Sequence, residues 1–210
     1  MVHSRPDIAL AVGVLGRYTQ DPAERHWIMC KRVLRYIQGT KHYGLEFQGS
    51  GDNQIVGYSD ADWAGDIADR KSTSGYAFFV NGSLVSSRSR KQQTVALSSA
   101  EAEYVALSSA VQEAMWLQRV LEEVGVRQHK PVLIKEDNQS AIAIATNPES
   151  HDKTKHIDIR HHFVRDLVEK GAIRLEYCPS VDMVADIFRI AFRAAAIRGR
   201  QARCSWRRDG

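Results

Sequence analysis

Four acidic residues are the part of this 210-residue chain whose types and spacing could support catalysis: Asp60, Glu103, Asp137 and Asp186. The sequence has no glycine-rich phosphate loop, no serine–histidine–aspartate order and no zinc-type spacing of cysteines and histidines. Carboxylates that lie close together repel one another unless divalent cations neutralise them, and Mg²⁺ prefers such oxygen ligands. A fold that gathers these acids would therefore form a site for Mg²⁺.

Asp60 ends the β-prone segment Ile55–Asp60. Side chains alternate between the two faces of a strand, so Asp60 shares a face with Val56 and Tyr58. An acid on such a half-buried face needs a reason, and metal binding would supply one. The alternative is that Asp60 and Asp62 simply begin a turn, where Asp is favoured, although Asp62 suits that turn better.

Glu101 and Glu103 lie at the start of a long predicted helix that follows Ser98 and ends near Glu123. They are about 200° apart around the helix, so only one can face a sheet. Steps of three and four from Glu103 meet an apolar column, Leu107, Ala110, Ala114, Leu117 and Leu121. Glu103 is therefore predicted to point inward, although the helix dipole alone favours an acid in the first turn.

Asp137 and Asp186 are predicted at two further element ends. Asp137 follows the apolar strand Val132–Ile134 and directly precedes a helix, so it could be a helix cap, a ligand or both. Asp186 is embedded in the apolar segment Met183–Phe188 of a predicted last helix, where an acid is unusual. Asp182, one turn earlier, is the competing candidate.

The elements that must position these acids follow from hydrophobic periodicity. A helix is predicted near Pro6, and an amphipathic helix over 22–38 places Trp27, Cys30, Leu34 and Ile37 on one face. Short segments bounded by Gly, Asn or Asp predict strands, the first four in a largely antiparallel meander. The predicted strands are 43–47, 55–60, 75–80, 83–87, 131–136 and 173–177, and the later helices are 99–123, 138–146, 155–170 and one after Pro179.

The element order βββαβααβα predicts an α/β (α+β) fold built on a mixed sheet, with a short helical appendage at the N-terminal side. The chain is 43% hydrophobic, which is enough for one main core. No stretch approaches the roughly 18 apolar residues of a membrane span, the start lacks the pattern of a secretion signal, and the three cysteines are unpaired in spacing. We therefore expect a soluble intracellular chain without membrane association.

Five motifs carry a resemblance to a known family. They are Tyr58–Gly65 (YSDADWAG), Arg70–Tyr76 (RKSTSGY), Leu97–Tyr104 (LSSAEAEY), Glu136–Ala141 (EDNQSA) and Lys155–Arg160 (KHIDIR). In this order they resemble the RNase H region of copia-type retrotransposon Pol polyproteins. The resemblance runs from about Ser4 to Phe188, and its first part, including Arg5–Ala9 and Arg32–Tyr36, is similar to the tail that links reverse transcriptase to RNase H.

The resemblance implies an RNase H-like fold with Asp60, Glu103, Asp137 and Asp186 in the places of the four metal-binding acids. Two Mg²⁺ ions, with Mn²⁺ as a substitute, would then support hydrolysis of the RNA strand of an RNA–DNA hybrid. The implied domains are a reverse-transcriptase tail (1–50), an RNase H-like domain (51–190) and a divergent, disordered tail (191–210). The implied partners are the hybrid and the rest of a Pol polyprotein, in the cytoplasm within a virus-like particle or in the nucleus.

Basic side chains beside the acids are candidates for contacts with nucleic-acid phosphates. The formal charge of +4 agrees with a polyanionic partner, but solvated surfaces carry similar charge. The candidates precede the long helix or lie in the later basic helix: Arg88, Arg90, Lys91, Lys155, His156 and Arg160.

One departure from the family pattern leaves a second hypothesis open. After Phe188 the family continues with Thr-Lys, whereas this chain continues with Arg189 and an arginine-rich tail. The alternative is therefore a catalytically inactive retrotransposon relic that only binds nucleic acid. A DDE-type integrase is disfavoured, because its acids follow the order Asp, Asp, Glu.

Overall fold

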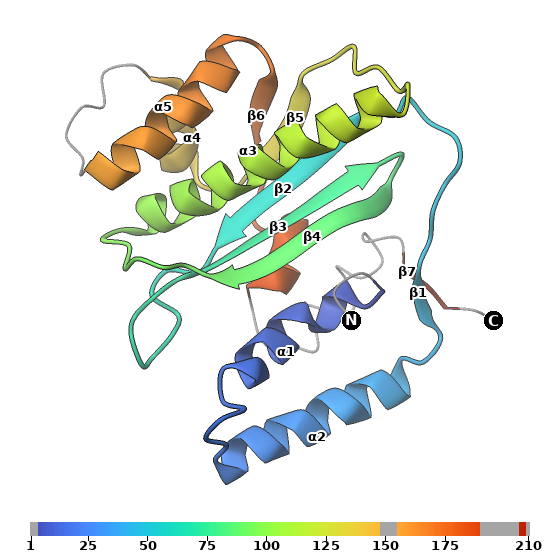
Figure 1. Ribbon diagram of the computed structural model, residues 1–210, viewed down its shortest axis with the longest axis vertical. Coiled ribbons are helices and arrows are strands. Elements are labelled where there is room, and N and C mark those ends of the chain that lie inside the picture. Colours follow the sequence, from blue (N-terminus) through green and yellow to red (C-terminus); the bar gives the residue numbers. More distant parts are fainter. Residues whose placement is uncertain (1–3, 148–154, 190–205, 209–210) are drawn as a thin grey trace.

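A five-stranded mixed sheet forms the centre of the computed structural model, which describes residues 4–147, 155–189 and 206–208 (Figure 1). The strands occur across the sheet in the order β4-β3-β2-β5-β6. Strands β2, β3 and β4 are antiparallel neighbours, whereas β5 runs parallel to both β2 and β6. The strand bounds are β2 Ile55–Ala61, β3 Thr73–Val80, β4 Ser83–Lys91, β5 Val132–Glu136 and β6 Ile173–Tyr177. The predicted mixed α/β fold is confirmed.

The local sequence explains these connections. Asn81 and Gly82 join β3 to β4 with φ angles of 52° and 74°, as a two-residue hairpin turn of the Asn-Gly type requires. Parallel strands need longer crossovers, which are usually helical. Here α3 (Ser99–Glu123) connects β4 to β5, and α4 (Gln139–Thr146) and α5 (Lys155–Glu169) lie between β5 and β6.

Helices α3, α4 and α5 cover one face of the sheet (Figure 1). The side chain of Ser98 accepts the N–H of Glu101 and caps α3. The apolar column predicted for this helix packs on the sheet, and full burial of a leucine such as Leu107 stabilises the fold by about 1.5–3 kcal/mol. The fully buried members of this core include Ile55, Phe78, Tyr104, Leu107, Ala110, Val111, Ala114, Val132 and Ile134.

The opposite face of the sheet carries the short 3₁₀ helix η2 (Val184–Phe188) and, beyond it, α1 (Ala9–Gly16) (Figure 1). A single 3₁₀ turn (Pro6–Ile8) precedes α1, and α2 (Glu24–Gly39) packs on α1. The predicted last helix after Pro179 is thus wrong in type. The described residues there form the five-residue 3₁₀ helix η2, which is buried against β2 and β3, and such tertiary packing overrides the local preference for an α-helix.

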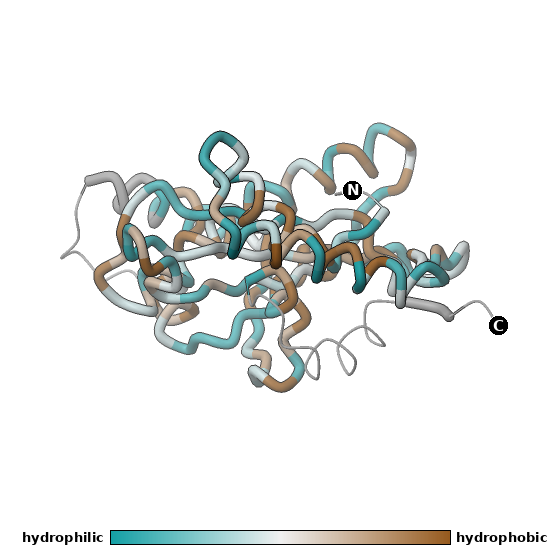
Figure 2. The backbone as a smooth tube through the Cα atoms, turned by 90° about the horizontal axis from the view of Figure 1, so that it is seen from below, coloured by the Kyte–Doolittle hydropathy of each residue, from teal (hydrophilic) through white to brown (hydrophobic). Residues whose placement is uncertain are grey.

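Helix α2 confirms the predicted amphipathic helix but not its buried face. In Figure 2 hydrophobic and hydrophilic residues alternate along the chain of α2, which lies towards the viewer. His26 and Val33 are its buried residues, whereas Trp27 and Leu34, predicted on the inner face, are 59% and 57% exposed. Helix α2 packs on α1, but much of its predicted apolar face stays exposed among the described residues. None of the helices in the described ranges is long and apolar enough to cross a membrane.

Strand β1 (Tyr43–Leu45) does not join the meander, contrary to the prediction. It pairs with β7 (Trp206–Arg208) in a separate two-stranded sheet. Three residues of the arginine-rich tail thus form a strand, and the rest of the tail predicted for 191–210 lies outside the described residues.

Candidate metal centre

The ends of two parallel strands bring Asp60 and Asp137 to the same edge of the sheet. Ser59 of β2 is in register with Glu136 of β5, so the next residue of each chain emerges beside the other. Glu103, at the start of α3, reaches this edge from the helical face. One carboxylate oxygen from each of Asp60, Glu103 and Asp137 lies within 4.8 Å of the others. This spacing suits three ligands of one divalent cation.

Burial gives this carboxylate cluster unusual electrostatics. Burial raises the pKa of Asp60 well above its usual range, while Arg189 opposes the shift and Asp186 and Glu103 add to it. Burial, reinforced by the charge of Asp137, raises the pKa of Glu103 to about 8. The buried oxygens Asp60 Oδ1 and Glu103 Oε2 have no hydrogen-bond partner among the described residues. A divalent cation fits here, since it would neutralise the cluster and coordinate these oxygens.

Asp137 is not the cap of the helix that follows it. The side chain of Asn138 caps α4 by accepting the N–H of Ala141 at 3.1 Å. Asp137 instead accepts a hydrogen bond from the Ser180 hydroxyl at 2.7 Å. Likewise, Glu101 accepts the N–H of Leu97 at 2.8 Å and so stabilises the start of α3 rather than joining the cluster. The residues that stabilise the helix starts are therefore Asn138 and Glu101, and not Asp137 and Glu103.

Asp186 lies beside Asp60, but an arginine joins the two. Asp186 is buried in η2, which packs on β2 and β3. Arg189 Nη2 lies 2.6 Å from Asp186 Oδ1, and Arg189 Nε donates a hydrogen bond to Asp60 Oδ2. The structure therefore gathers all four predicted acids, but only Asp60, Glu103 and Asp137 form a group open to a cation.

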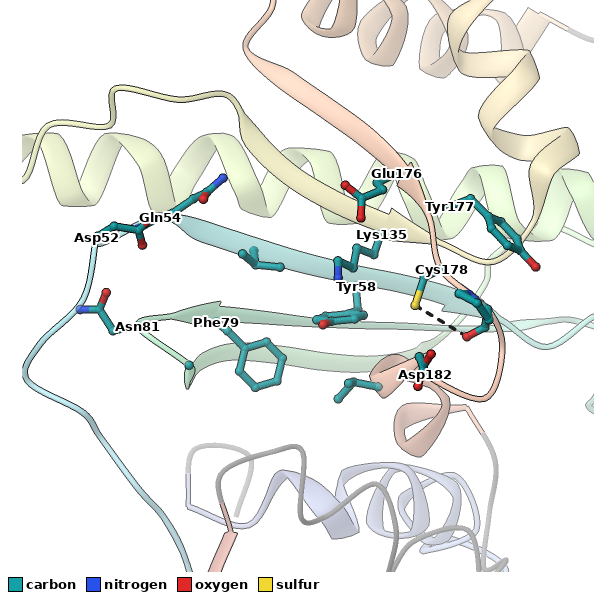
Figure 3. Close-up of a pocket in the computed structure, with 14 residues that line it drawn as sticks. Asp52, Gln54, Tyr58, Phe79, Asn81, Lys135, Glu176, Tyr177, Cys178 and Asp182 are labelled. Carbon is teal, nitrogen blue, oxygen red and sulfur yellow. Dashed lines mark hydrogen bonds between the residues drawn. The ribbon is translucent and has the colours of Figure 1, made fainter.

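Asp182, the competing candidate, lies elsewhere. It lines a cavity of about 760 Å³ on the face of the sheet that carries η2, together with Tyr58, Phe79, Lys135 and Cys178 (Figure 3). The ammonium of Lys135 lies 5.6 Å from the centre of the Tyr58 ring. None of the four predicted acids lines this cavity.

Glu136 was missed as part of the site. It is fully buried on the face that also carries Val132 and Ile134, and burial, followed by the charges of Glu103 and Asp60, raises its pKa well above the usual range. Its Oε1 accepts the N–H of Asn138 at 3.4 Å. Strand alternation could have predicted that Glu136 is buried, because Glu136 lies on the same face of β5 as Val132 and Ile134. The acid lies beneath the cluster but outside the group of three.

The predicted basic residues occupy β4 and its surroundings. Arg88, Arg90 and Lys91 belong to β4, which is longer than predicted, and not to a loop before α3. With Arg160 of α5 they line a polar groove of about 280 Å³. Lys91 is held in ion pairs with Asp66 and Asp69 at 2.5 and 2.7 Å. The side chains of Lys155 and His156 lie outside the described residues.

The central sheet, with antiparallel β2–β4, parallel β5 and β6, and acids at the ends of β2 and β5, defines a ribonuclease H-like fold. No protein-family model matches the chain. The chain is 45% identical over 175 residues to the retrovirus-related Pol polyprotein from transposon TNT 1-94 of Nicotiana tabacum. The matched region is 83% of this chain but only 13% of that polyprotein. The chain belongs to this family of retrovirus-related transposon Pol polyproteins, of which it spans a short part.

Two further comparisons were found. The secreted RxLR effector protein 161 of Plasmopara viticola is 62% identical over 117 residues, which is 56% of this chain and 82% of that protein. Among solved structures, the N-terminal RNase H domain of a Mycobacterium tuberculosis protein superposes with a TM-score of 0.49 at 13% identity, over 70% of this chain and 97% of that one.

Proposed function

We propose that this chain is a Mg²⁺-dependent endoribonuclease that cleaves the RNA strand of RNA–DNA hybrids, as the RNase H part of a transposon Pol polyprotein. The observation that carries the proposal is the group of three carboxylate oxygens within 4.8 Å of one another at the edge of the sheet. Such a group has a high electrostatic cost unless cations neutralise it. Its place in a Pol-related chain favours nucleic-acid chemistry over a purely structural cation site.

The residues that would hold the cation are Asp60, Glu103 and Asp137. A bound Mg²⁺ would lower the pKa of a water and stabilise charge on the leaving oxygen at phosphorus. The parallel pairing of β2 with β5 fixes the positions of Asp60 and Asp137. The apolar column of α3, which packs on the sheet, fixes the position of Glu103. The Ser180 hydroxyl holds Asp137 in place. This preorganisation limits the reorganisation that catalysis would require.

The groove beside β4 suits the sugar-phosphate backbone of the hybrid. Arg88, Arg90 and Arg160 line it, and guanidinium groups bind phosphate oxygens well. Contacts of this kind position a nucleic acid but carry no sequence information. Selection of the RNA strand would then depend on its 2′-hydroxyl groups and on groove width. Lys91 contributes less, because Asp66 and Asp69 neutralise it.

A second candidate is a protein that binds nucleic acid without cleaving it. The observation that favours it is Arg189, whose guanidinium lies between Asp60 and Asp186. An arginine here takes up carboxylate oxygens that a second cation would need. The two candidates share the same surface and differ only in turnover.

Cleavage of a hybrid with an end-labelled RNA strand tests the proposal. In Mg²⁺ we expect shortened RNA with 3′-hydroxyl and 5′-phosphate ends, and none in EDTA, because the chemistry needs the cation. Duplex DNA and single-stranded RNA of the same sequence serve as controls and should stay intact. Hybrid binding by folded protein without cleavage would support the binding protein instead, and the absence of both would refute both candidates.

Cation binding is also expected to depend on pH. Because the pKa of Glu103 is about 8 in the cation-free fold, its proton must leave when the cation binds. Affinity for Mg²⁺ should rise by up to about tenfold per pH unit below pH 8 and level off above it. Calorimetry in buffers of different protonation enthalpy measures the released proton. Equal affinity at pH 6 and pH 8 would contradict this prediction.

The same pKa shift sets the stability of the cation-free protein. A carboxyl group whose pKa is raised by folding contributes most below its ordinary value of 4.5, and this contribution is lost as the pH rises through about 8. The Glu103→Gln variant should release fewer protons when the cation binds and should lose less stability as the pH rises, whereas Glu122→Gln, an exposed control on the same helix, should match the unaltered protein in both.

A further inference from the structure

Arg189 is the residue that departs from the family pattern, and it reaches into the acid cluster. Its Nε donates to Asp60 Oδ2 and its Nη2 lies 2.6 Å from Asp186 Oδ1. The Asp60 side chain is fully buried, and the Asp186 and Arg189 side chains are 3% and 22% exposed. A permanently charged guanidinium thus pairs with two buried carboxylates and offsets one of their two negative charges.

The backbone around Arg189 is held firmly in position. The fully buried Phe188 packs against Gly75 so closely that a Cβ on that glycine would lie 2.8 Å from the Phe188 Cβ. The Ser89 hydroxyl donates to the Phe188 carbonyl at 2.5 Å. The Arg189 N–H donates to the Asp186 carbonyl at 3.2 Å. The packing of Phe188 and these hydrogen bonds therefore fix the backbone from which the Arg189 guanidinium reaches the two carboxylates.

Electrostatics favours this placement. Burial acts against the charge of Arg189, but Asp60 and Asp186 together raise the pKa of its guanidinium above the usual value. The guanidinium carries one positive charge where a divalent cation would bring two. The buried oxygens Asp60 Oδ1 and Glu103 Oε2 have no hydrogen-bond partner among the described residues, and one carboxylate oxygen from each of Asp60, Glu103 and Asp137 lies within 4.8 Å of the others.

We infer that Arg189 occupies the position of a second cation, so that the chain binds one divalent ion at Asp60, Glu103 and Asp137 and admits a second only when the guanidinium leaves. This inference rests on the proposed function, since it requires that the acids bind cations. A place for the displaced side chain exists: Arg189 also lines a cavity of about 520 Å³ that contains Asp62 and Asp66. The side chain therefore competes with the ion and does not seal the site.

The test is the number of Mn²⁺ ions bound, measured by electron paramagnetic resonance and calorimetry on the full chain. We expect one ion for the unaltered protein and two for Arg189→Gln, or a second site whose Kd falls at least about tenfold, which corresponds to 1.4 kcal/mol. Arg174→Gln removes an arginine from an exposed pair with Glu176 and should leave the single site unchanged. Arg189→Lys keeps the charge and should also bind one ion.

Thermal unfolding provides a second readout that does not depend on activity. Without cations Arg189→Gln should melt at a lower temperature, because Asp60 and Asp186 then face each other unneutralised, and Mn²⁺ should raise its Tm more than that of the unaltered chain. Two ions of unchanged affinity in both proteins, or one ion in both, would overturn the role of Arg189 while the cation site stands. No ion in either folded protein would overturn the cation site itself.

Discussion

Replacing Asp60 by asparagine is expected to reduce cleavage of the RNA strand by roughly a thousandfold, because a catalytic cation contributes several kcal/mol and 1.36 kcal/mol corresponds to tenfold in rate. One carboxylate oxygen of Asp60 lies within 4.8 Å of the ligand oxygens of Glu103 and Asp137. An amide retains the size of the side chain but loses the charge that attracts the cation. Initial rates on a labelled hybrid in Mg²⁺ measure the loss.

The matched control for this variant is Asp166→Asn on the surface of α5. Asp166 is more than half exposed and pairs with Lys170 one turn away, an interaction worth less than about 1 kcal/mol. Its rate should stay within about twofold of the unaltered protein. Circular dichroism must show that both variants are folded. Full activity in folded Asp60→Asn would exclude this carboxylate from the reaction.

Truncating Phe78 to alanine is expected to lower the free energy of unfolding by about 3–5 kcal/mol. Phe78 is fully buried between the sheet and α3, and its ring lies against Gly57, where an added Cβ would come within 2.4 Å of it. The truncation therefore leaves a cavity that the tight backbone around it cannot easily fill. A domain has a total stability of about 5–15 kcal/mol, so the variant would lie near the limit of folding.

Urea denaturation measures this effect. Val85→Ala, on the neighbouring strand β4, is the control, because Val85 is 43% exposed and should lose no more than about 0.5 kcal/mol. A loss below about 1 kcal/mol for Phe78→Ala would mean that the packing of β3 against α3 is looser than the structure indicates.

The sequence predicted the elements best where periodicity was long. The 25 residues of α3 begin and end where the Ser98 cap and the apolar column indicated, and that column directs Glu103 inward. Strand alternation likewise predicts the face of β2 on which Asp60 lies, and its place at the end of the predicted strand predicts that it lies at the edge of the sheet. Both features are local, so they could be inferred without knowing which strands pair.

The rest of the site depends on contacts between distant parts of the chain. Arg189 meets Asp60 only because η2 packs on β3 through the approach of Phe188 to Gly75. Nothing local to Arg189 indicates that approach. Glu136 was passed over because Asp137, its neighbour, fits both a cap and a ligand, whereas the burial of Glu136 depends on α3 covering β5. The short η2 was predicted as a regular helix because its packing on β2 and β3 is likewise a contact between distant parts of the chain.

The parallel pairing of β2 with β5 also links the cation to the lifetime of the fold. Asp60 and Asp137 meet only after the chain has crossed over through α3, and such distant contacts form late, after loop-closure entropy has been paid. The unfolded chain therefore has no comparable site. An ion at a hundred times its Kd would add about 2.7 kcal/mol to the native state. Free Mg²⁺ would then set how long the native chain survives as well as how fast it cuts.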